Sequence, residues 1–267
     1  MKKIIVPIDF SDNSINALEF AGELAKRTSS RLIILHILPV KEDDKESESK
    51  LNSARERLEK AHGNELKCET ELMHGKLVPA MNKVIGSEKP DLIIMGTKGA
   101  TGLKRILIGS NTVSVMAKTK VPMLVIPEAA RFKNFSQKGK NKIVLATNLD
   151  EPENDNALDI LKEISMMIIE PHVKVLNVRP KGTRLSEMGD LQRNRLLSFF
   201  NPEIESERIT VFSENIIRGI NYYLNKQDDI GLVAMIARDS GKIFQKHYTR
   251  AMASYTELPL LILHNKK

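Results

Sequence analysis

The residues most able to do chemistry form a glycine-rich segment in the first half of the chain. Its notable members are Gly96, Lys98, Gly99, Gly102, Gly109, Ser110, Asn111 and Thr112. Glycines leave main-chain amides bare, and bare amides, hydroxyls and a helix N-terminus together suit phosphate oxygens. The segment contains neither a Walker A sequence nor the dinucleotide fingerprint G-x-G-x-x-G. Taken alone, a tight turn with a helix cap explains the glycines equally well.

The glycine-rich segment falls between two predicted strands of an alternating α/β chain. Continuous β-branched runs predict buried parallel strands with helices on both faces. In the first half we expect strands at 3–8, 31–38, 68–73, 92–95 and 121–126. The first helix is capped by Ser11 or Ser14. An open doubly wound sheet binds ligands at the carboxyl ends of its strands, and Asp9 follows the first strand.

The second half repeats the order of the first. Strand-like runs recur at offsets of 139, 140 and 137 residues, beginning at Lys142, Leu232 and Leu258. Such self-similarity indicates duplication. A polar, weakly periodic segment at 131–141 is interpreted as a linker between domains at 1–130 and 142–267.

Composition limits the classes of function. The 267 residues carry a formal net charge of +7, and the basic excess lies in the first half, with 24 Lys and Arg against 17 Asp and Glu before residue 141. Trp is absent and aromatics are 4%, so a stacking platform for nucleic acid is not favoured, whereas a small polyanion suits the charge. Cys68 is the one cysteine, no apolar run is long enough for a membrane helix, and we expect a cytoplasmic protein.

The spacing of the glycines resembles that of the universal stress protein family, specifically the tandem-domain members of its nucleotide-binding branch. The pattern is Gly, two residues, Gly, nine residues and Gly-Ser, placed between a fourth and a fifth strand, with Val-Pro-Ile-Asp9 at the end of the first. The architecture covers nearly the whole chain, but the specific motif covers only residues 1–127. The resemblance implies two Rossmann-like domains with open parallel sheets, of the adenine nucleotide α-hydrolase-like kind. They would pack as a pseudo-dimer through their last strands, and a homodimer is a further option.

The resemblance also implies a ligand, ATP or another adenine nucleotide, with or without Mg²⁺. Asp9 would face the adenosine and Ile37 would cover the adenine, although an Asx turn is an alternative role for Asp9. Lys98 would neutralise phosphate charge, or it is simply a solvated loop lysine. The other implied contacts are Pro7, Ile8, Met95 and Gly96 for the nucleoside, and Gly99, Gly109, Ser110, Asn111 and Thr112 for the phosphates.

The second half departs from this pattern. Asn148 stands in place of Asp9, Ile236 stands in place of Gly96, and no residue corresponds to Gly99. Lys246 and His247 occupy the places of Gly109 and Ser110, where their side chains would fill the phosphate space. We therefore expect no nucleotide in the second domain.

Three functions remain open on the sequence. The first is a stress-response module that binds adenine nucleotide through one domain and a partner through the other. The second is an enzyme, but the segment offers no carboxylate to act as a base, so at most slow ATP hydrolysis is expected. His74 follows the third strand and is the one histidine expected near the loop. The third is a scaffold that binds no nucleotide. No metal-ligand set and no nucleophilic triad is readable.

Overall fold

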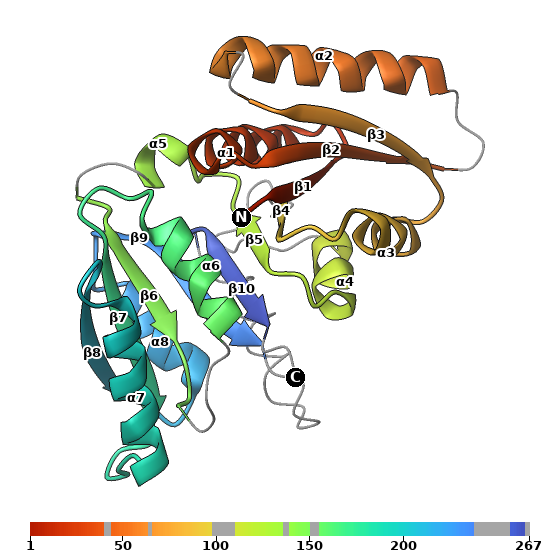
Figure 1. Cartoon of the computed structure of the whole chain (residues 1–267). Coiled ribbons are helices and arrows are strands. Elements are labelled where there is room, and N and C mark those ends of the chain that lie inside the picture. The colour runs from red at the N-terminus through yellow and green to blue at the C-terminus, as the bar shows by residue number, and fades with distance from the viewer. Residues whose placement is uncertain are drawn as a thin grey trace. The chain divides into compact units, whose positions relative to one another are not determined.

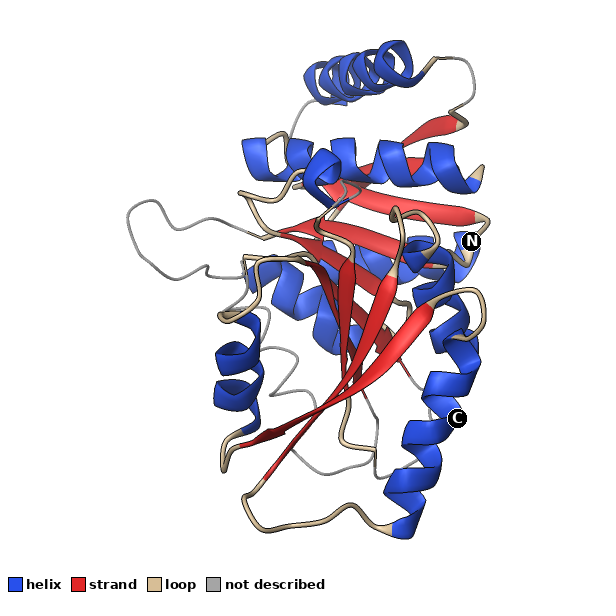
Figure 2. Cartoon of the chain, turned by 90° about the vertical axis from the view of Figure 1, so that its left-hand side faces the viewer, coloured by secondary structure: helices blue, strands red, loops and turns tan. Residues whose placement is uncertain are grey.

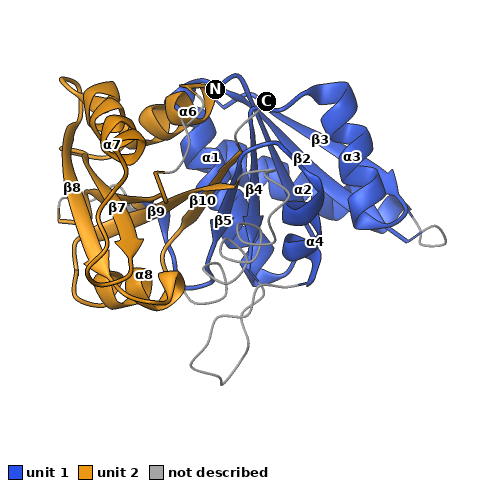
Figure 3. Ribbon diagram, turned by 90° about the horizontal axis from the view of Figure 1, so that it is seen from below, with its two compact units in different colours: residues 1–132 blue, residues 133–267 orange. Residues whose placement is uncertain are grey.

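The computed structural model describes residues 1–39, 44–63, 66–97, 110–135, 139–149, 155–237 and 257–264. The chain divides into two compact units, residues 1–132 and 133–267 (Figure 3). Helices and strands alternate along the first unit. Their bounds are β1 (Lys3–Ile8), α1 (Asp12–Thr28), β2 (Arg31–Leu38), α2 (Asp44–His62), β3 (Cys68–His74), α3 (Leu77–Glu88), β4 (Leu92–Gly96), α4 (Ser110–Lys118) and β5 (Met123–Ile126).

The strands of the first unit lie in the order β3-β2-β1-β4-β5, and every neighbouring pair is parallel. β1 is central, because Ile5 pairs with Ile33 of β2 on one side and with Ile93 of β4 on the other. Helices α1 and α2 cover one face of the sheet, and α3 and α4 cover the other (Figure 1). Strands covered on both faces must be apolar throughout, which explains the continuous apolar runs of β1, β4 and β5.

Helix α1 shows how local sequence fixes the start and end of an element. Ser11 is its N-cap, and the Ser11 hydroxyl accepts a hydrogen bond from the Ser14 amide. The helix ends at Ser29, which has left-handed backbone geometry with φ of 53°. Leu18 and Leu24 lie on the buried side, with 2% and 0% of their surfaces exposed. Of the two serines that the sequence offers as caps, the structure therefore uses Ser11.

The second unit has the same strand order. Its elements are β6 (Lys142–Ala146), α6 (Asp155–Ser165), β7 (His172–Arg179), α7 (Glu187–Phe200), β8 (Glu205–Phe212), α8 (Ile216–Leu224), β9 (Ile230–Ala237) and β10 (Leu260–His264). Its strands run β8-β7-β6-β9-β10, all parallel, so β6 corresponds to β1 and β9 to β4. In both units helices flank the strands (Figure 2). The predicted α/β fold with parallel sheets is confirmed.

A short helix, α5 (Phe132–Phe135), lies within the segment expected to be a linker. The Phe132 ring meets the Phe20 ring edge-on at 4.9 Å between centroids, and the Arg27 guanidinium lies 4.9 Å from the Phe132 centroid. Phe132 is therefore anchored to α1 of the first unit. Across the described ranges, no helix combines the length and the apolar character needed to cross a membrane.

Candidate functional site

The turn between β1 and α1 holds a carboxylate at the carboxyl end of the sheet. Asp9 Oδ1 accepts hydrogen bonds from the Ser11 amide at 3.1 Å and from the Ser11 hydroxyl at 2.5 Å. The alternative role of Asp9, an Asx turn leading into α1, is therefore realised in the structure. Burial raises the pKa of the Asp9 carboxyl, but hydrogen bonds from Ser11 and Ser14 outweigh burial and lower the net pKa below 3.8. Asp9 is exposed. Its carboxylate therefore stabilises the turn and also presents an ionised group at the surface.

The same turn is fixed from β2 by a buried histidine. His36 Nδ1 donates a hydrogen bond of 2.7 Å to the main-chain oxygen of Ile8, the last residue of β1. The His36 ring also contacts the Phe10 ring, with 4.4 Å between centroids. Phe10 has a φ of 60°, which is rare for a bulky residue. The hydrogen bond and the ring contact together hold the backbone around Asp9 in one shape.

The end of β4 and the start of α4 meet through Gly96 and Thr112. The Thr112 hydroxyl is buried and donates a hydrogen bond of 2.9 Å to the main-chain oxygen of Gly96. A Cβ built on Gly96 would lie 2.7 Å from the main-chain oxygen of Asn13 and 2.8 Å from Asn13 Nδ2. The missing side chain at Gly96 thus lets the first turn of α1 approach the end of β4. These contacts join the β1–α1 turn to the start of α4.

Among the residues that the structure describes, two buried polar atoms beside this junction have no hydrogen-bond partner. They are Asn13 Oδ1 and Thr97 Oγ1, and Thr97 directly follows Gly96. Buried polar atoms are nearly always paired, so unpaired ones mark a place where a further partner would be accommodated. Sequence reasoning passed over both residues, and also Phe10 and His36. The available signals were the positions of Phe10 next to Asp9, of Thr97 next to Gly96 and of His36 near the end of its strand, whereas Asn13 had none.

The remaining residues of the implied site fall into three groups. Pro7 and Met95 are buried in β1 and β4, and Ile37 is half-buried at the end of β2. Ser110 and Asn111 are exposed in the first turn of α4, where main-chain N–H groups have no intrahelical acceptor. Lys98, Gly99 and Gly109 lie outside the described residues. The structure therefore brings Asp9, Ile37, Gly96 and the start of α4 to one edge of the sheet.

The second unit repeats the turn but not the bare glycine. Asn177 occupies the same register position on β7 as His36 on β2, and Asn177 Nδ2 donates 3.1 Å to the main-chain oxygen of Thr147, the counterpart of Ile8. Leu149, which corresponds to Phe10, has a φ of 63°. Ile236, however, stands at the register position of Gly96, with a side chain buried in β9. Lys246 and His247 lie outside the described residues.

The described residues near the sheet include a histidine–carboxylate pair and one thiol. His74 Nε2 lies 2.8 Å from Asp44 Oδ1 at the start of α2. Burial raises the pKa of the Cys68 thiol to about 12, so that thiol stays protonated at neutral pH. Within the ranges described above, no cluster of His, Cys, Asp and Glu is arranged to hold a metal ion. Among the described carboxylates, Asp9 alone was predicted from the sequence to lie in the site.

Known proteins resemble this chain over its first half and over its whole fold. The family model of the universal stress protein family matches residues 1–127. A universal stress protein of Methanocaldococcus jannaschii is 36% identical over 146 residues, covering 47% of this chain and 81% of that protein. A second one from the same organism is 28% identical and covers 47% of this chain and 94% of its own length. The crystal structure of a universal stress protein from Archaeoglobus fulgidus covers 99% of this chain and 98% of its own, with a TM-score of 0.76 and 20% identity. At that identity the last likeness concerns the fold alone.

Proposed function

Because the chain belongs to the universal stress protein family, we propose that its first unit binds an adenine nucleotide at the carboxyl ends of β1 and β4. The observation that carries the proposal is the junction of Gly96 with Asn13 and Thr112. A side chain at Gly96 would collide with α1, so the glycine lets the end of β4 pack beside α1 and the first turn of α4. The main-chain N–H groups of a helix N-terminus at this end of a sheet are the groups that bind phosphate in α/β folds.

The proposed contacts divide between nucleoside and phosphates. Asp9 would accept hydrogen bonds from the adenosine, beside main-chain atoms of Pro7 and Ile8, and Ile37 would cover the adenine. Met95 and Gly96 would line the base and the ribose. For the phosphates we propose Lys98, Gly99, Gly109, Ser110, Asn111 and Thr112. The Thr112 hydroxyl already donates a hydrogen bond to the main-chain oxygen of Gly96, so Thr112 would bind phosphate through its main-chain N–H. Mg²⁺, if present, would be held chiefly by the phosphates, since the described residues offer no cluster of ligands.

We propose a tandem-domain protein in which the second unit binds no nucleotide. Ile236 supports this, because its side chain lies where the first unit has Gly96. Asn148 supports it as well, since an amide in place of Asp9 brings no charge. The proposed domains are 1–130 and 142–267 with a linker at 131–141. The second domain would serve as a platform for a protein partner.

Three further parts of the proposal concern assembly, catalysis and location. The last strands of the two domains would pair within the chain or between two copies. Hydrolysis of ATP would be slow at best, because no base is assigned beside the phosphates. A cytoplasmic location fits a chain whose single cysteine has no partner for an internal disulfide.

Titration calorimetry of the full chain with ATP tests the proposal. We expect one nucleotide per chain and no release of phosphate over the titration. Replacing Gly109 by Val should abolish the heat while the circular dichroism spectrum stays unchanged. Gly86→Val is the matched control, because a Cβ at Gly86 meets nothing within 4 Å. Absence of heat with the unaltered chain would favour the scaffold, and steady release of phosphate would favour the ATPase.

A further inference from the structure

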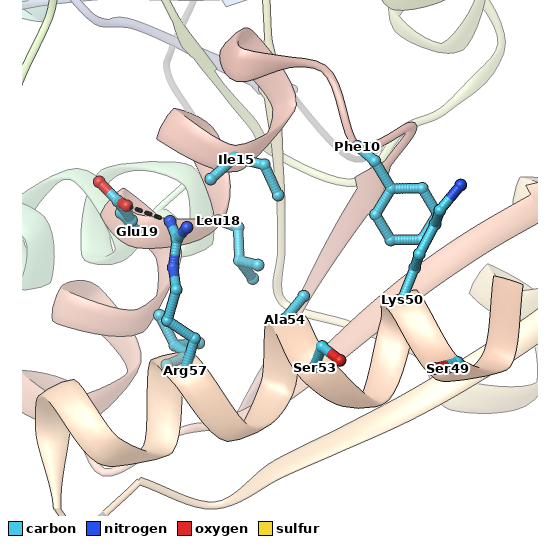
Figure 4. Close-up of a pocket in the computed structure, with 10 residues that line it drawn as sticks. Phe10, Ile15, Leu18, Glu19, Ser49, Lys50, Ser53, Ala54 and Arg57 are labelled. Atoms are coloured by element: carbon cyan, nitrogen blue, oxygen red, sulfur yellow. Dashed lines mark hydrogen bonds and ion pairs between the residues drawn. The ribbon is translucent and has the colours of Figure 1, made fainter. Parts of the chain in front are cut away.

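A pocket of about 410 Å³ lies between α1 and α2 of the first unit (Figure 4). Its volume is within the ordinary range of small-molecule sites. Phe10, Ile15, Leu18 and Glu19 line it from the side of α1, and Ser49, Lys50, Ser53, Ala54, Arg57 and Leu58 line it from α2. Of these ten residues, the nucleotide proposal uses none.

The pocket follows from how unevenly the two helices approach each other. At one end they are close, because Leu58 Cδ1 lies 2.7 Å from where a Cβ on Gly22 would be, and Lys26 Nζ donates 3.0 Å to the main-chain oxygen of His62. Toward the other end α2 lines the pocket with Lys50 and with the small side chains of Ser49, Ser53 and Ala54. Of the 19 residues of α2, only Leu51 and Leu58 are buried. Small residues opposite α1 therefore leave the space unfilled.

The floor of the pocket is apolar and remains within reach of a ligand. Leu18 and Leu58 are buried, whereas Phe10, Ile15 and Ala54 are half-buried. Half-buried apolar groups around a cavity gain stability when an apolar body removes them from water. Phe10 adds a strained element, because its φ is 60°, and its ring contacts the ring of His36. Strained residues of this kind are commonly found at ligand sites.

The rim of the pocket carries more positive than negative charge. Arg57 pairs with Glu19 at 2.6 Å, and Lys50 pairs with Glu46 at 2.6 Å, a carboxylate that does not line the pocket. All four side chains are more than half exposed. Exposed ion pairs contribute little to stability, so either cation can exchange its partner for another anion at small cost.

We propose that this α1–α2 pocket is a second ligand site of the protein, for a small molecule with an apolar body and one acidic group. The apolar body lies against Leu18, Leu58 and Phe10. The acidic group lies at the rim beside Lys50, because Arg57 is seven residues further along α2, about 10 Å away, and is paired with Glu19. The proposal goes beyond nucleotide binding and does not depend on it, because its residues come from the facing sides of two helices. Since Phe10 directly follows Asp9, the ligand also contacts the turn that carries the nucleotide site.

Fluorescence titration with anilinonaphthalene sulfonate tests the proposal, with phenylnaphthylamine as its neutral relative. We expect one saturable site per chain. Ser53→Trp should fill the pocket and lower the affinity for the sulfonate probe by about tenfold or more. Asn52→Trp, at an exposed neighbour outside the pocket, should bind like the unaltered chain. Lys50→Gln should lower the affinity for the sulfonate probe about two- to fivefold and leave the affinity for the neutral probe unchanged.

Three results would overturn the second site. They are equal affinities for Ser53→Trp and Asn52→Trp, no saturable binding to the unaltered chain, and displacement of the probe by ATP. If Ser53→Trp does not fold, methyl NMR of the unaltered chain decides instead. The methyl resonances of Ile15, Leu18 and Leu58 must then shift with the probe, and their constancy would contradict the proposal. Failure of ATP binding alone would leave this inference standing.

Discussion

Asn13 lies directly over Gly96, so that a Cβ on Gly96 would come within 2.7 Å of the main-chain oxygen of Asn13 and 2.8 Å of its Nδ2 atom. The nearest of these atoms is main chain, and it cannot move without disturbing the first turn of α1. The same turn carries Ser11, which holds the carboxylate of Asp9. The glycine therefore supports the proposed site by letting α1, and with it the turn that holds Asp9, pack against the end of β4.

Replacing Gly96 by Ala should destabilise the protein and weaken nucleotide binding. The methyl group overpacks the contact with Asn13, which typically costs about 1–3 kcal/mol. Urea unfolding measures the stability, and calorimetry with ATP measures the affinity. Gly86→Ala is the control, since a Cβ there meets nothing within 4 Å and alanine favours a helix by up to about 1 kcal/mol. A Gly96→Ala protein as stable as the Gly86→Ala control would contradict the packing argument.

The hydrogen bond from Thr112 to Gly96 gives a second prediction. Thr112→Val keeps the shape of the side chain but removes the donor, and the free energy of unfolding should fall by about 1–3 kcal/mol. Nucleotide affinity should fall as well, because the start of α4 is no longer tied to β4. Thr112→Ser should retain most of the affinity, since it keeps the hydroxyl. Equal affinities for the Val and Ser variants would show that the hydroxyl does not position α4.

The carboxyl of Asp9 predicts a dependence of stability on pH. Its folded pKa lies below the ordinary value, so its contribution is present above the unfolded pKa and is lost as the pH falls through the folded pKa. We expect the stability difference between the unaltered chain and Asp9→Asn to be constant above about pH 5 and to shrink below about pH 4. Urea unfolding at a series of pH values measures the difference. A difference that widens on acidification would have the wrong sign for this account.

His36 and Asn177 make equivalent hydrogen bonds in the two units, which yields a fourth prediction. His36→Leu removes the side-chain hydrogen bond to the main-chain oxygen of Ile8 and should lower the free energy of unfolding by about 1–3 kcal/mol. His36→Asn introduces the residue type that the second unit uses, and should lower it by less. Thermal and urea unfolding of the two variants measure the difference. Equal losses would assign the role of His36 to ring packing against Phe10 instead.

The order of helices and strands was predicted from the sequence alone. So were the glycine positions at which the first unit lacks a side chain and the second does not. Buried parallel strands are read directly from continuous apolar runs, because strands covered on both faces tolerate little else. The correspondence of Ile236 with Gly96 also follows from the repeat, and the register of β9 with β10 agrees with it. The roles of the individual residues in binding a nucleotide stay predictions.

The contacts that hold the site together were beyond sequence reasoning. Asn13 meets Gly96 only because α1 folds back across β4, and nothing local to either residue signals the contact. The left-handed backbone of Phe10 was equally unreadable, since bulky residues seldom adopt it. His36 lies in β2, and its hydrogen bond to the main-chain oxygen of Ile8 on β1 could not be predicted from the residues around it. Helix α5 forms in a polar segment, and the ring of its first residue, Phe132, packs against Phe20 of α1.

A crystal structure of the full chain grown with saturating ATP would test nucleotide binding most directly. The account predicts one nucleotide per chain, with the adenosine beside Asp9, Ile37 and Gly96 and the phosphates against the main chain at Ser110 and Asn111. A first unit without nucleotide, or a nucleotide seated at Asn148 and Ile236 of the second unit, would contradict it.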